Sequence, residues 1–316
     1  MQRGKVNRHV AITGITGLIG ARLANVLAEQ GFTVYGLMRD EPSNIYLNSK
    51  INKIYGNVNS LEDVSYFIKK SSPEHIFHLA AETQAHESVT YPYNTMYTNF
   101  VGTLNILEAA RLYASASAIV VASSDKAYGE LEGEEYLEES PLNGAYPYDA
   151  SKAATETVVR AYRKSYNMPA VTTRSCNVYG PGDNNTQRLI PGIFKSHLSG
   201  EEFELRNGGR DIREYIHVDD LVEAYISVAK HVETKNLHPS FNISSGDRYS
   251  TIEVFSLMEK AIGKEVNFKI AFDGSIEINR QVMSYKLLHS ETGWAPKIPF
   301  EKGLKDVVGW YMNNTQ

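Results

Sequence analysis

Cysteine is almost absent from this 316-residue sequence, in which Cys176 is the single example. One thiol cannot form an internal disulfide, and its isolation excludes metal sites built from several cysteines. Long apolar runs are absent as well, because no stretch approaches the roughly 20 residues that span a bilayer. The N-terminal residues lead directly into a strand-like segment, without the apolar region of a signal peptide. These absences predict a cytoplasmic protein that does not enter a membrane.

Basic charge is not in excess either. The formal net charge is −5 and lysine and arginine form no basic arm, so we expect no nucleic-acid partner. The hydrophobic share of 42% and the charged share of 22% are ordinary for a globular enzyme. No spacing of histidine, aspartate and glutamate indicates a metal site. A chain of this length predicts one large α/β domain with a smaller appendage.

The first half of the chain alternates short β-branched runs with amphipathic stretches, which is typical of βαβ units on a parallel sheet. The predicted strands are His9–Thr13, Thr33–Leu37, Lys53–Tyr55, His75–Leu79, Ala118–Ala122 and Ala170–Arg174. The predicted helices are Leu18–Gln30, Leu61–Lys70, Asn94–Tyr113, Pro147–Tyr166, Leu189–Leu198, Asp219–Val232, Thr251–Ile262 and Phe300–Tyr311.

This pattern predicts the α/β class, with a Rossmann-type, doubly wound parallel sheet in residues 1–180 and later segments that cross back to it. Residues 181–316 are expected to form mainly a smaller C-terminal α/β lobe that binds the substrate. The acidic segment Glu130–Glu139 indicates a surface loop and is a candidate for a movable flap.

A glycine-rich turn follows the first predicted strand. Gly14, Gly17 and Gly20 open an Ala/Leu-rich helix, where glycines permit a tight turn and let the backbone approach a pyrophosphate. Asp40 follows the second strand, where an acidic group would bind the adenosine ribose of NAD and repel the extra phosphate of NADP. Arg39 beside it could instead bind that phosphate, but we favour NAD as the cofactor.

Tyr148 and Lys152 are four residues apart on a predicted helix and therefore share one face of it. A nearby ammonium favours the phenolate of a tyrosine, whose ordinary pKa is about 10. Such a tyrosine could take a proton from a sugar or alcohol hydroxyl near neutral pH. The pair alone is also a common pattern on solvated helices, so its meaning depends on the motifs around it.

Several further motifs occur in order along the chain. They are His78-Leu-Ala-Ala81, Asn99 within Thr-Asn-Phe-Val-Gly-Thr, Ser123-Ser-Asp-Lys-Ala-Tyr-Gly129, Arg174-Ser-Cys-Asn177-Val-Tyr-Gly-Pro181, Arg213-Glu-Tyr-Ile-His217 and Gly293-Trp294-Ala-Pro296. With the glycine turn and the Tyr148/Lys152 pair, they resemble the extended short-chain dehydrogenase/reductases that act on nucleotide-activated sugars. The resemblance covers essentially the whole chain and implies an NAD-dependent epimerase or dehydratase.

Within that family, the residues after the active-site serine distinguish the reactions. Ser124-Asp125-Lys126 is similar to the CDP-glucose 4,6-dehydratases, whereas epimerases typically carry small residues here. The resemblance implies that Tyr148 takes the proton of the sugar 4-hydroxyl while hydride passes to NAD, and that Ser124 positions the 4-oxygen. Asp125 would be the acid at the carbon 6 hydroxyl and Lys126 the base at carbon 5. Hydride return to carbon 6 would then give a 4-keto-6-deoxy sugar.

The resemblance also implies which residues, beyond Tyr148 and Lys152, bind the ligands. The implied cofactor-binding residues are Gly14, Thr16, Gly17, Leu18, Ile19, Gly20, Arg39, Asp40, Asn57, Val58, Leu79, Ala80, Ala81 and Asn99. The implied substrate-binding residues are Thr83, Ser124, Asn177, Arg188, Arg213 and Arg280, with Glu82 beside Thr83. In the family an aspartate usually faces the adenine where this chain has Asn57, whose amide could do the same. Met283 replaces a frequent aspartate near the substrate nucleotide, which leaves the nucleobase of the substrate open. His78 and His217, in apolar segments, are expected to be core residues.

Three functions stay open from the sequence: a nucleotide-sugar 4,6-dehydratase, a 4-epimerase or 4-ketosugar reductase on the same scaffold, and a dinucleotide-binding regulator without chemistry. Asp125 and Lys126 favour the first, although an exposed ion pair would be their alternative role. Tyr148 and Lys152 argue against the third, because such regulators usually lose this pair. The resemblance further implies a homodimer in which Asn94–Tyr113 and Pro147–Tyr166 form a four-helix bundle.

Overall fold

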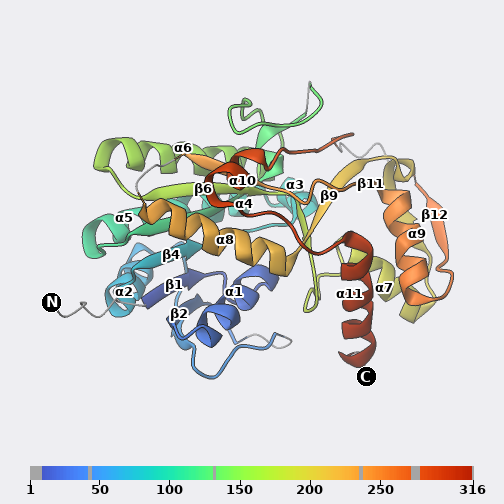
Figure 1. Ribbon diagram of the computed structural model, residues 1–316, viewed down its shortest axis with the longest axis horizontal. Helices are drawn as coiled ribbons and strands as arrows, with labels where there is room; N and C mark the ends of the chain where they lie inside the picture. The colour runs from blue at the N-terminus through green and yellow to red at the C-terminus, as the bar shows by residue number, and fades with distance from the viewer. Residues whose placement is uncertain (1–8, 42–44, 131–132, 235–237, 272–277, 315–316) are drawn as a thin grey trace.

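A seven-stranded parallel sheet forms the centre of the molecule (Figure 1). The computed structural model describes residues 9–41, 45–130, 133–234, 238–271 and 278–314. The strands of this sheet are β1 (His9–Thr13), β2 (Thr33–Met38), β3 (Asn52–Tyr55), β4 (His75–His78), β5 (Ala118–Ser124), β6 (Ala170–Ser175) and β10 (Ser240–Ile243). They lie in the order β10-β6-β5-β4-β1-β2-β3, with every neighbouring pair parallel. The expected Rossmann-type α/β fold is confirmed.

Helices cover both faces of the sheet. Side chains of α1 (Leu18–Glu29) and α8 (Val218–Glu233) form one core, and those of α2 (Leu61–Ser71), α5 (Gly102–Tyr113) and α6 (Pro147–Tyr166) form the other. The central strand β5 alternates between them: Ala118 and Val120 belong to the first core, while Ile119 and Val121 belong to the second. Strands buried on both faces need continuous apolar runs, which is why these segments were recognisable in the sequence.

Two elements beyond residue 180 complete this sheet. Helix α8 packs on it, and β10 adds its outer strand beside β6. The strand β10 was not among the predicted strands. Its buried residues include Ser240 and Asn242, and Asn242 is fully buried. Polar side chains on a buried strand interrupt the apolar run by which such strands are recognised.

The predicted helix Asn94–Tyr113 is interrupted in the structure. Helices α3 (Ala85–Thr90) and α4 (Pro92–Met96) lead into a π-helical turn, η1 (Tyr97–Val101), and only then does α5 begin. Turns of this kind are rare inside helices and are frequent at functional sites. Here the turn carries Asn99, one of the predicted site residues.

A smaller lobe lies at the right of Figure 1, beyond the carboxyl ends of the central strands. Its strands are β7 (Asn177–Tyr179), β9 (Ile212–His217) and β11 (Arg248–Ser250) in one sheet, and β8 (Phe203–Leu205) and β12 (Phe268–Ile270) in another. Its helices are α7 (Leu189–Ser199), α9 (Thr251–Ile262) and α11 (Phe300–Asn314), around a core rich in aromatic side chains. The short helix α10 (Lys286–Thr292) packs on α8 and β10.

The segment Glu130–Glu139 is not simply a surface loop, and that expectation is wrong at Tyr136. Tyr136 is buried, its amide donates to the carbonyl of Val282, and its carbonyl accepts from the amide of Ser284. Its ring stacks on Tyr128 with the centroids 4.4 Å apart. Residues 131–132 lie outside the described part of the chain. The acidic composition of the segment predicted exposure throughout, but Tyr136 is buried and anchors the segment to the core.

A buried ion pair joins the main helix of the second core to the sheet. Both oxygens of Glu156 on α6 accept from the guanidinium of Arg174 on β6, the shortest contact being 2.6 Å. Ser123 on β5 donates to the same carboxylate at 2.6 Å. Arg174 also donates to the Tyr128 hydroxyl and to the carbonyl of Glu138. The pair therefore ties together α6, two strands and the segment that contains Tyr136.

Replacing Arg174 by methionine should lower the free energy of unfolding by roughly 3–5 kcal/mol, because Glu156 would stay buried without its counter-ion. Urea unfolding followed by circular dichroism measures this change. Arg111→Met is the matched control: Arg111 pairs with Glu108 on the partly exposed surface of α5, and its loss should cost less than about 1 kcal/mol. Equal losses in the two variants would contradict the importance of the buried pair.

Candidate active site

The glycine turn between β1 and α1 closely approaches the end of β4. Gly14 has a φ of +70°, and a β-carbon on it would lie 2.7 Å from the amide nitrogen of Ala80. A β-carbon on Gly20 would lie 2.1 Å from the carbonyl oxygen of Gly14. Helix α1 begins after Gly17, and no side chain caps its first amides. An uncapped helix N-terminus beside a close-packed glycine turn suits a pyrophosphate, so the residues present fit a dinucleotide.

The turn opens into a cleft of about 830 Å³ between the central sheet and the smaller lobe. Most of the predicted site residues line it, and they come from both halves of the chain. The residues that line the cleft are Gly14, Thr16, Gly17, Leu18, Ile19, Gly20, Arg39, Asn57, Val58, Leu79, Ala80, Ala81, Thr83, Ser124, Asp125, Lys126, Tyr148, Lys152, Asn177, Arg188 and Arg213. Three predicted residues do not line it: Asp40, Asn99 and Arg280.

Arg39 and Asp40 separate at the end of β2. Arg39 lines the cleft, with its Nη1 3.9 Å from a carboxylate oxygen of Glu82, whereas Asp40 is exposed and outside the lining. The predicted contact of Asp40 with the ribose stays a prediction.

Asn99 lies beneath the cleft. Its side chain accepts from the amide of Glu82 at 2.8 Å and donates to the carbonyl of Glu82 at 3.1 Å and to the Ser151 hydroxyl at 2.8 Å. Both amide hydrogens of Asn99 are used by these protein contacts. Asn99 thus fixes the backbone beside Thr83, and its predicted contact with the cofactor stays a prediction.

His78 is a satisfied core residue, as expected. Its Nε2 lies 3.1 Å from the Thr103 hydroxyl, which itself donates to the Asn99 carbonyl, so the Nε2 must be the donor. Its Nδ1 lies 2.7 Å from the Thr13 hydroxyl. Burial and the nearby charge of Lys152 lower the pKa of His78 to about 3, so the ring stays neutral. His217 accepts from the Asp219 amide and caps α8.

Tyr148 and Lys152 stand on the first turns of α6, facing the end of β5. The Lys152 Nζ donates to the carbonyl of Ala122 at 3.0 Å and lies 5.9 Å from the centre of the Tyr148 ring. Burial lowers the pKa of Lys152 to about 8, with the carboxylate of Glu156 acting in the opposite direction. The pKa of Tyr148 is raised and not lowered as expected, because burial is the largest effect; the hydrogen bond with Ser124 opposes the rise and the charge of Asp125 adds to it.

Ser124, Asp125 and Lys126 end β5 and begin a 3-10 turn, η2 (Asp125–Tyr128). The Ser124 hydroxyl donates to the Asp125 carboxyl at 2.9 Å and accepts from the Lys126 amide at 3.3 Å. Asp125 is 4% exposed, and burial raises its pKa against the opposing charges of Lys126 and Arg213. Asp125 therefore does not belong to an exposed ion pair with Lys126, the alternative role considered above. Its carboxyl is buried in the wall of the cleft.

Candidate anion-binding groups line the part of the cleft that belongs to the smaller lobe. Arg213 on β9 is 7% exposed, and Arg188 pairs with the buried Asp183 at 3.2 Å. The Asn177 side chain donates to the carbonyl of Glu214 at 3.3 Å, which holds it at the start of β7. Among the described residues, no group of three histidine, cysteine, aspartate or glutamate side chains is arranged to hold a metal ion.

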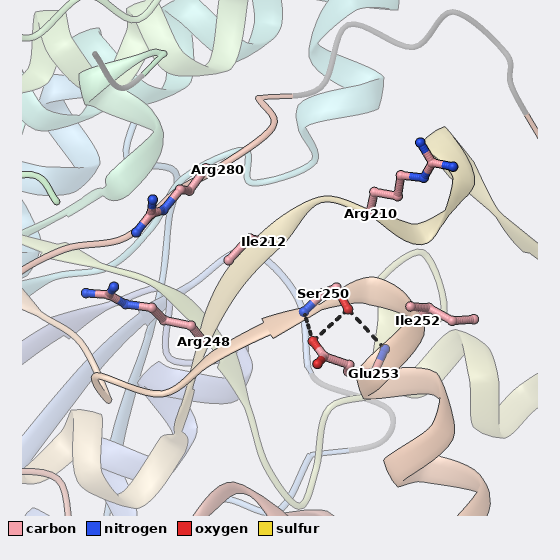
Figure 2. A pocket seen from close by; sticks show the side chains of 7 residues that line it. All are labelled: Arg210, Ile212, Arg248, Ser250, Ile252, Glu253 and Arg280. Atoms are coloured by element: carbon pink, nitrogen blue, oxygen red, sulfur yellow. Dashed lines mark hydrogen bonds between the residues drawn. The ribbon is translucent and has the colours of Figure 1, made fainter. Parts of the chain in front are cut away.

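Arg280 lies elsewhere, in a separate pocket with Arg210 and Arg248 (Figure 2). It pairs in parallel with Ile212, so its side chain is on the same face of β9 as Ile212, while Arg213 is on the other. The expected convergence of Arg213 and Arg280 on one site is not present in this structure.

Glu214 was not predicted and lies buried between these elements. Its carboxyl accepts from the Ser244 hydroxyl and from the Met283 amide, each at 2.7 Å. Burial raises its pKa to about 7, and the charge of Asp125 contributes to the rise. A glutamate next to an arginine in Arg213-Glu214 shows no sign of burial in the sequence, because its partners lie 30 and 69 residues away.

The family model of the "NAD dependent epimerase/dehydratase family" matches residues 10–244. The chain belongs to this family. The resemblance inferred from the motifs is thereby confirmed, and so is NAD as the cofactor. Among the described residues, no helix is long and apolar enough to cross a membrane.

Three similar proteins come from both branches of the family. The dTDP-glucose 4,6-dehydratase of Haemophilus influenzae is 27% identical over 97% of this chain and 98% of its own length. The solved UDP-glucose 4-epimerase of Thermotoga maritima, with UDP-glucose, is 26% identical, with a TM-score of 0.87 over 97% of this chain and 99% of that one. The dTDP-glucose 4,6-dehydratase of Bacillus anthracis, in complex with NAD, is 26% identical, with a TM-score of 0.85 over 96% of each chain.

Glu214 should make the stability of this family member fall as the pH rises. Its pKa is raised from 4.5 in the unfolded chain to about 7 in the folded protein. The contribution of Glu214 to the free energy of unfolding is therefore complete below pH 4.5 and is lost as the pH rises through 7. The loss should reach roughly 3 kcal/mol at most, since one pKa unit corresponds to about 1.4 kcal/mol. Glu214→Gln should flatten this part of the profile, measured by urea unfolding at a series of pH values. The exposed Glu29→Gln should leave it unchanged, and a parallel shift in both variants would refute the assignment.

Proposed function

We propose that the protein is an NAD-dependent nucleotide-sugar 4,6-dehydratase, a lyase that produces a 4-keto-6-deoxy sugar. The observation that carries the proposal is the buried Asp125 between Ser124 and Lys126, on the same cleft wall as Tyr148. Dehydration needs an acid and a base in addition to the groups for alcohol oxidation. The two residues that follow Ser124 supply one of each type.

We assign the cofactor to the part of the cleft next to the glycine turn. The pyrophosphate would lie at the start of α1, with Gly17 closest, and Arg39, Asn57 and Val58 would surround the adenosine. Bound there, NAD would supply a reversible hydride acceptor and a positive charge that would oppose the effect of burial on the pKa of Tyr148.

Tyr148 is the group that we assign to the sugar 4-hydroxyl. It accepts the hydroxyl proton as the carbon 4 hydride leaves, and Ser124 holds the 4-oxygen. Lys152 carries a pKa of about 8 and therefore exists in both protonation states near neutral pH. Its ammonium form stabilises the phenolate on the same helix face, and its bond to the Ala122 carbonyl fixes its place.

The elimination step uses Lys126 and Asp125. The ketone at carbon 4 acidifies the carbon 5 hydrogen, and Lys126 in its neutral form takes that proton. Asp125 gives its proton to the carbon 6 hydroxyl, which leaves as water. Burial holds a proton on Asp125 at higher pH than usual, which suits an acid. Hydride addition at carbon 6 and a proton at carbon 5 then complete the product.

The smaller lobe would hold the nucleoside diphosphate. We assign the diphosphate to Arg188, Arg213 and Asn177, which line the cleft beyond the catalytic groups. Thr83, beside the backbone that Asn99 fixes, would contact the sugar. The names of the relatives mention dTDP and UDP, whereas the motif Ser124-Asp125-Lys126 favours CDP, so the nucleobase is left to experiment.

A 4-epimerase is the second candidate, because the Thermotoga maritima epimerase has the same fold over almost the whole chain. An epimerase also needs Tyr148, Lys152 and Ser124, but it needs no acid at carbon 6. The buried Asp125, whose pKa is raised by burial, has no task in that reaction, and this favours dehydration.

Incubation with CDP-, UDP-, GDP- and dTDP-hexoses, followed by mass spectrometry, tests the proposal. One sugar nucleotide should lose the mass of one water. Asp125→Asn and Lys126→Met should each slow this loss by about 10²- to 10⁴-fold, since each removes a proton-transfer group. Both should still exchange hydride between carbon 4 and NAD, and Tyr148→Phe should not. An altered sugar of unchanged mass would instead identify an epimerase, and full dehydration by Lys126→Met would exclude this lysine as the base.

We also propose that the protein forms a homodimer through α4, η1, α5 and α6. Tyr93, Met96 and Tyr97 on this face are 73%, 40% and 39% exposed, and the rings of Tyr93 and Tyr97 stack 5.6 Å apart. An exposed apolar cluster of this kind favours association with a second copy.

Sedimentation velocity should show a dimer that Tyr93→Glu together with Met96→Glu converts to a monomer, because two charges would be buried in the interface. Tyr46→Glu is the control, since Tyr46 is also 73% exposed but lies outside these helices. A monomeric parent protein, or a double variant that stays dimeric, would rule out this interface.

A further inference from the structure

A second pocket, of about 300 Å³, lies behind the cleft (Figure 2). The strand β9 and the residues that lead to it separate the two: Arg210 and Ile212 line the pocket, and Asp211 and Arg213 line the cleft. The start of α9 divides in the same way, with Ser250 and Ile252 on the pocket and Thr251 on the cleft. The pocket and the cleft share no lining residue, so they are two separate places.

Two arginines, Arg248 on β11 and Arg280 in an isolated bridge to β9, lie at one side of this pocket. Figure 2 shows the guanidinium groups of Arg248 and Arg280 on the same side of Ile212, while Arg210 lies on the other. Arg248 has one partner, Glu135, at 3.5 Å across an exposed contact. The Nε of Arg280 is buried and has no hydrogen-bond partner among the described residues. A buried guanidinium nitrogen without an acceptor, beside a second guanidinium, is suited to an anion.

Glu253, the one carboxylate among the described residues that line the pocket, does not neutralise these two arginines. Glu253 accepts from the amide and the hydroxyl of Ser250, each at 2.7 Å, and closes the capping box of α9. Its charge is held by the helix start, at the opposite end of the pocket from the pair formed by Arg248 and Arg280 (Figure 2). Among the described residues that line the pocket, three arginines against this one glutamate leave an excess of positive charge.

The remaining lining is apolar. Ile212 lies between the arginines and Ile252 lies on the side of Arg210, and together they provide a surface for a compact apolar group (Figure 2). An apolar floor with a few convergent polar groups is the usual composition of a small-molecule site, and this volume is at the lower end of that range.

We infer that this pocket binds a small phosphate ester, with its phosphate on Arg248 and Arg280 and its apolar body on Ile212 and Ile252. The site is additional to the nucleotide-sugar cleft and does not require that the chain be a dehydratase. The phosphate would satisfy the Nε of Arg280 and bridge two like charges that otherwise repel each other.

Phenyl phosphate is the probe, because it carries both a phosphate and a compact apolar group. Inorganic phosphate, which lacks the apolar group, is the comparison. Calorimetry is performed on protein in which NAD and a nucleotide sugar already saturate the cleft. Phenyl phosphate should bind with one site per chain and more tightly than inorganic phosphate. Arg248→Gln should weaken both by about tenfold, as expected for the loss of a charge-assisted hydrogen bond. Ile252→Ser should weaken phenyl phosphate several-fold and leave inorganic phosphate unchanged.

Arg160→Gln is the matched control, because it removes the same charge from an exposed position on α6 and should change neither affinity. The proposal is overturned if saturation of the cleft abolishes phenyl phosphate binding, since the probe would then have been in the cleft. It is overturned equally if Arg248→Gln and Arg160→Gln have the same effect. Circular dichroism shows that each variant is folded, and none of these measurements depends on turnover, so failure of the dehydratase assignment would be seen separately.

Discussion

The buried ion pair between Glu156 and Arg174 is the contact on which the arrangement of the cleft depends. It fixes α6 against β5 and β6, and α6 carries Tyr148 and Lys152 on its first turns. Because a helix is rigid over two turns, fixing Glu156 also fixes Lys152 one turn earlier, where the carboxylate opposes the effect of burial on the lysine pKa. The same arginine reaches Tyr128 and Glu138, so one guanidinium organises both the proton-transfer helix and the segment that follows the catalytic turn.

Burial, more than pairwise attraction, sets the proton positions in this cleft. It raises the pKa of Tyr148 and Asp125 and lowers the pKa of Lys152 to about 8, so it shifts the equilibrium of each group towards the neutral form. This agrees with the low polarity of a wall built from β5 and α6, where the ionised form of each group is penalised. The cationic groups Arg188 and Arg213 line the part of the cleft that belongs to the smaller lobe, and the uncapped N-terminus of α1 lies beside the glycine turn.

Local patterns were enough to predict much of this structure. The six predicted strands and the glycine turn follow from continuous apolar runs and from short-range spacing, and Tyr148 with Lys152 follows from helix periodicity. What the sequence could not show depends on partners distant along the chain. Nothing local revealed that the Glu82 backbone uses the side-chain amide of Asn99. Tyr136 was hidden in an acidic segment, Glu214 in a polar one, and the orientation of Arg280 depends on its pairing with Ile212.

The fold itself cannot decide between dehydration and epimerisation. The solved epimerase and the solved dehydratase match this chain almost equally, with TM-scores of 0.87 and 0.85, so the backbone is common to both reactions. The groups for oxidising carbon 4 are common as well, because both reactions begin there. The difference must therefore lie in side chains that act at carbons 5 and 6. On this chain the candidates are Asp125 and Lys126 on η2, the single turn that follows β5. Tyr128 at the end of this turn stacks on Tyr136. A change of reaction then requires new side chains on one 3-10 turn and leaves the sheet, the helices and the cofactor site as they are.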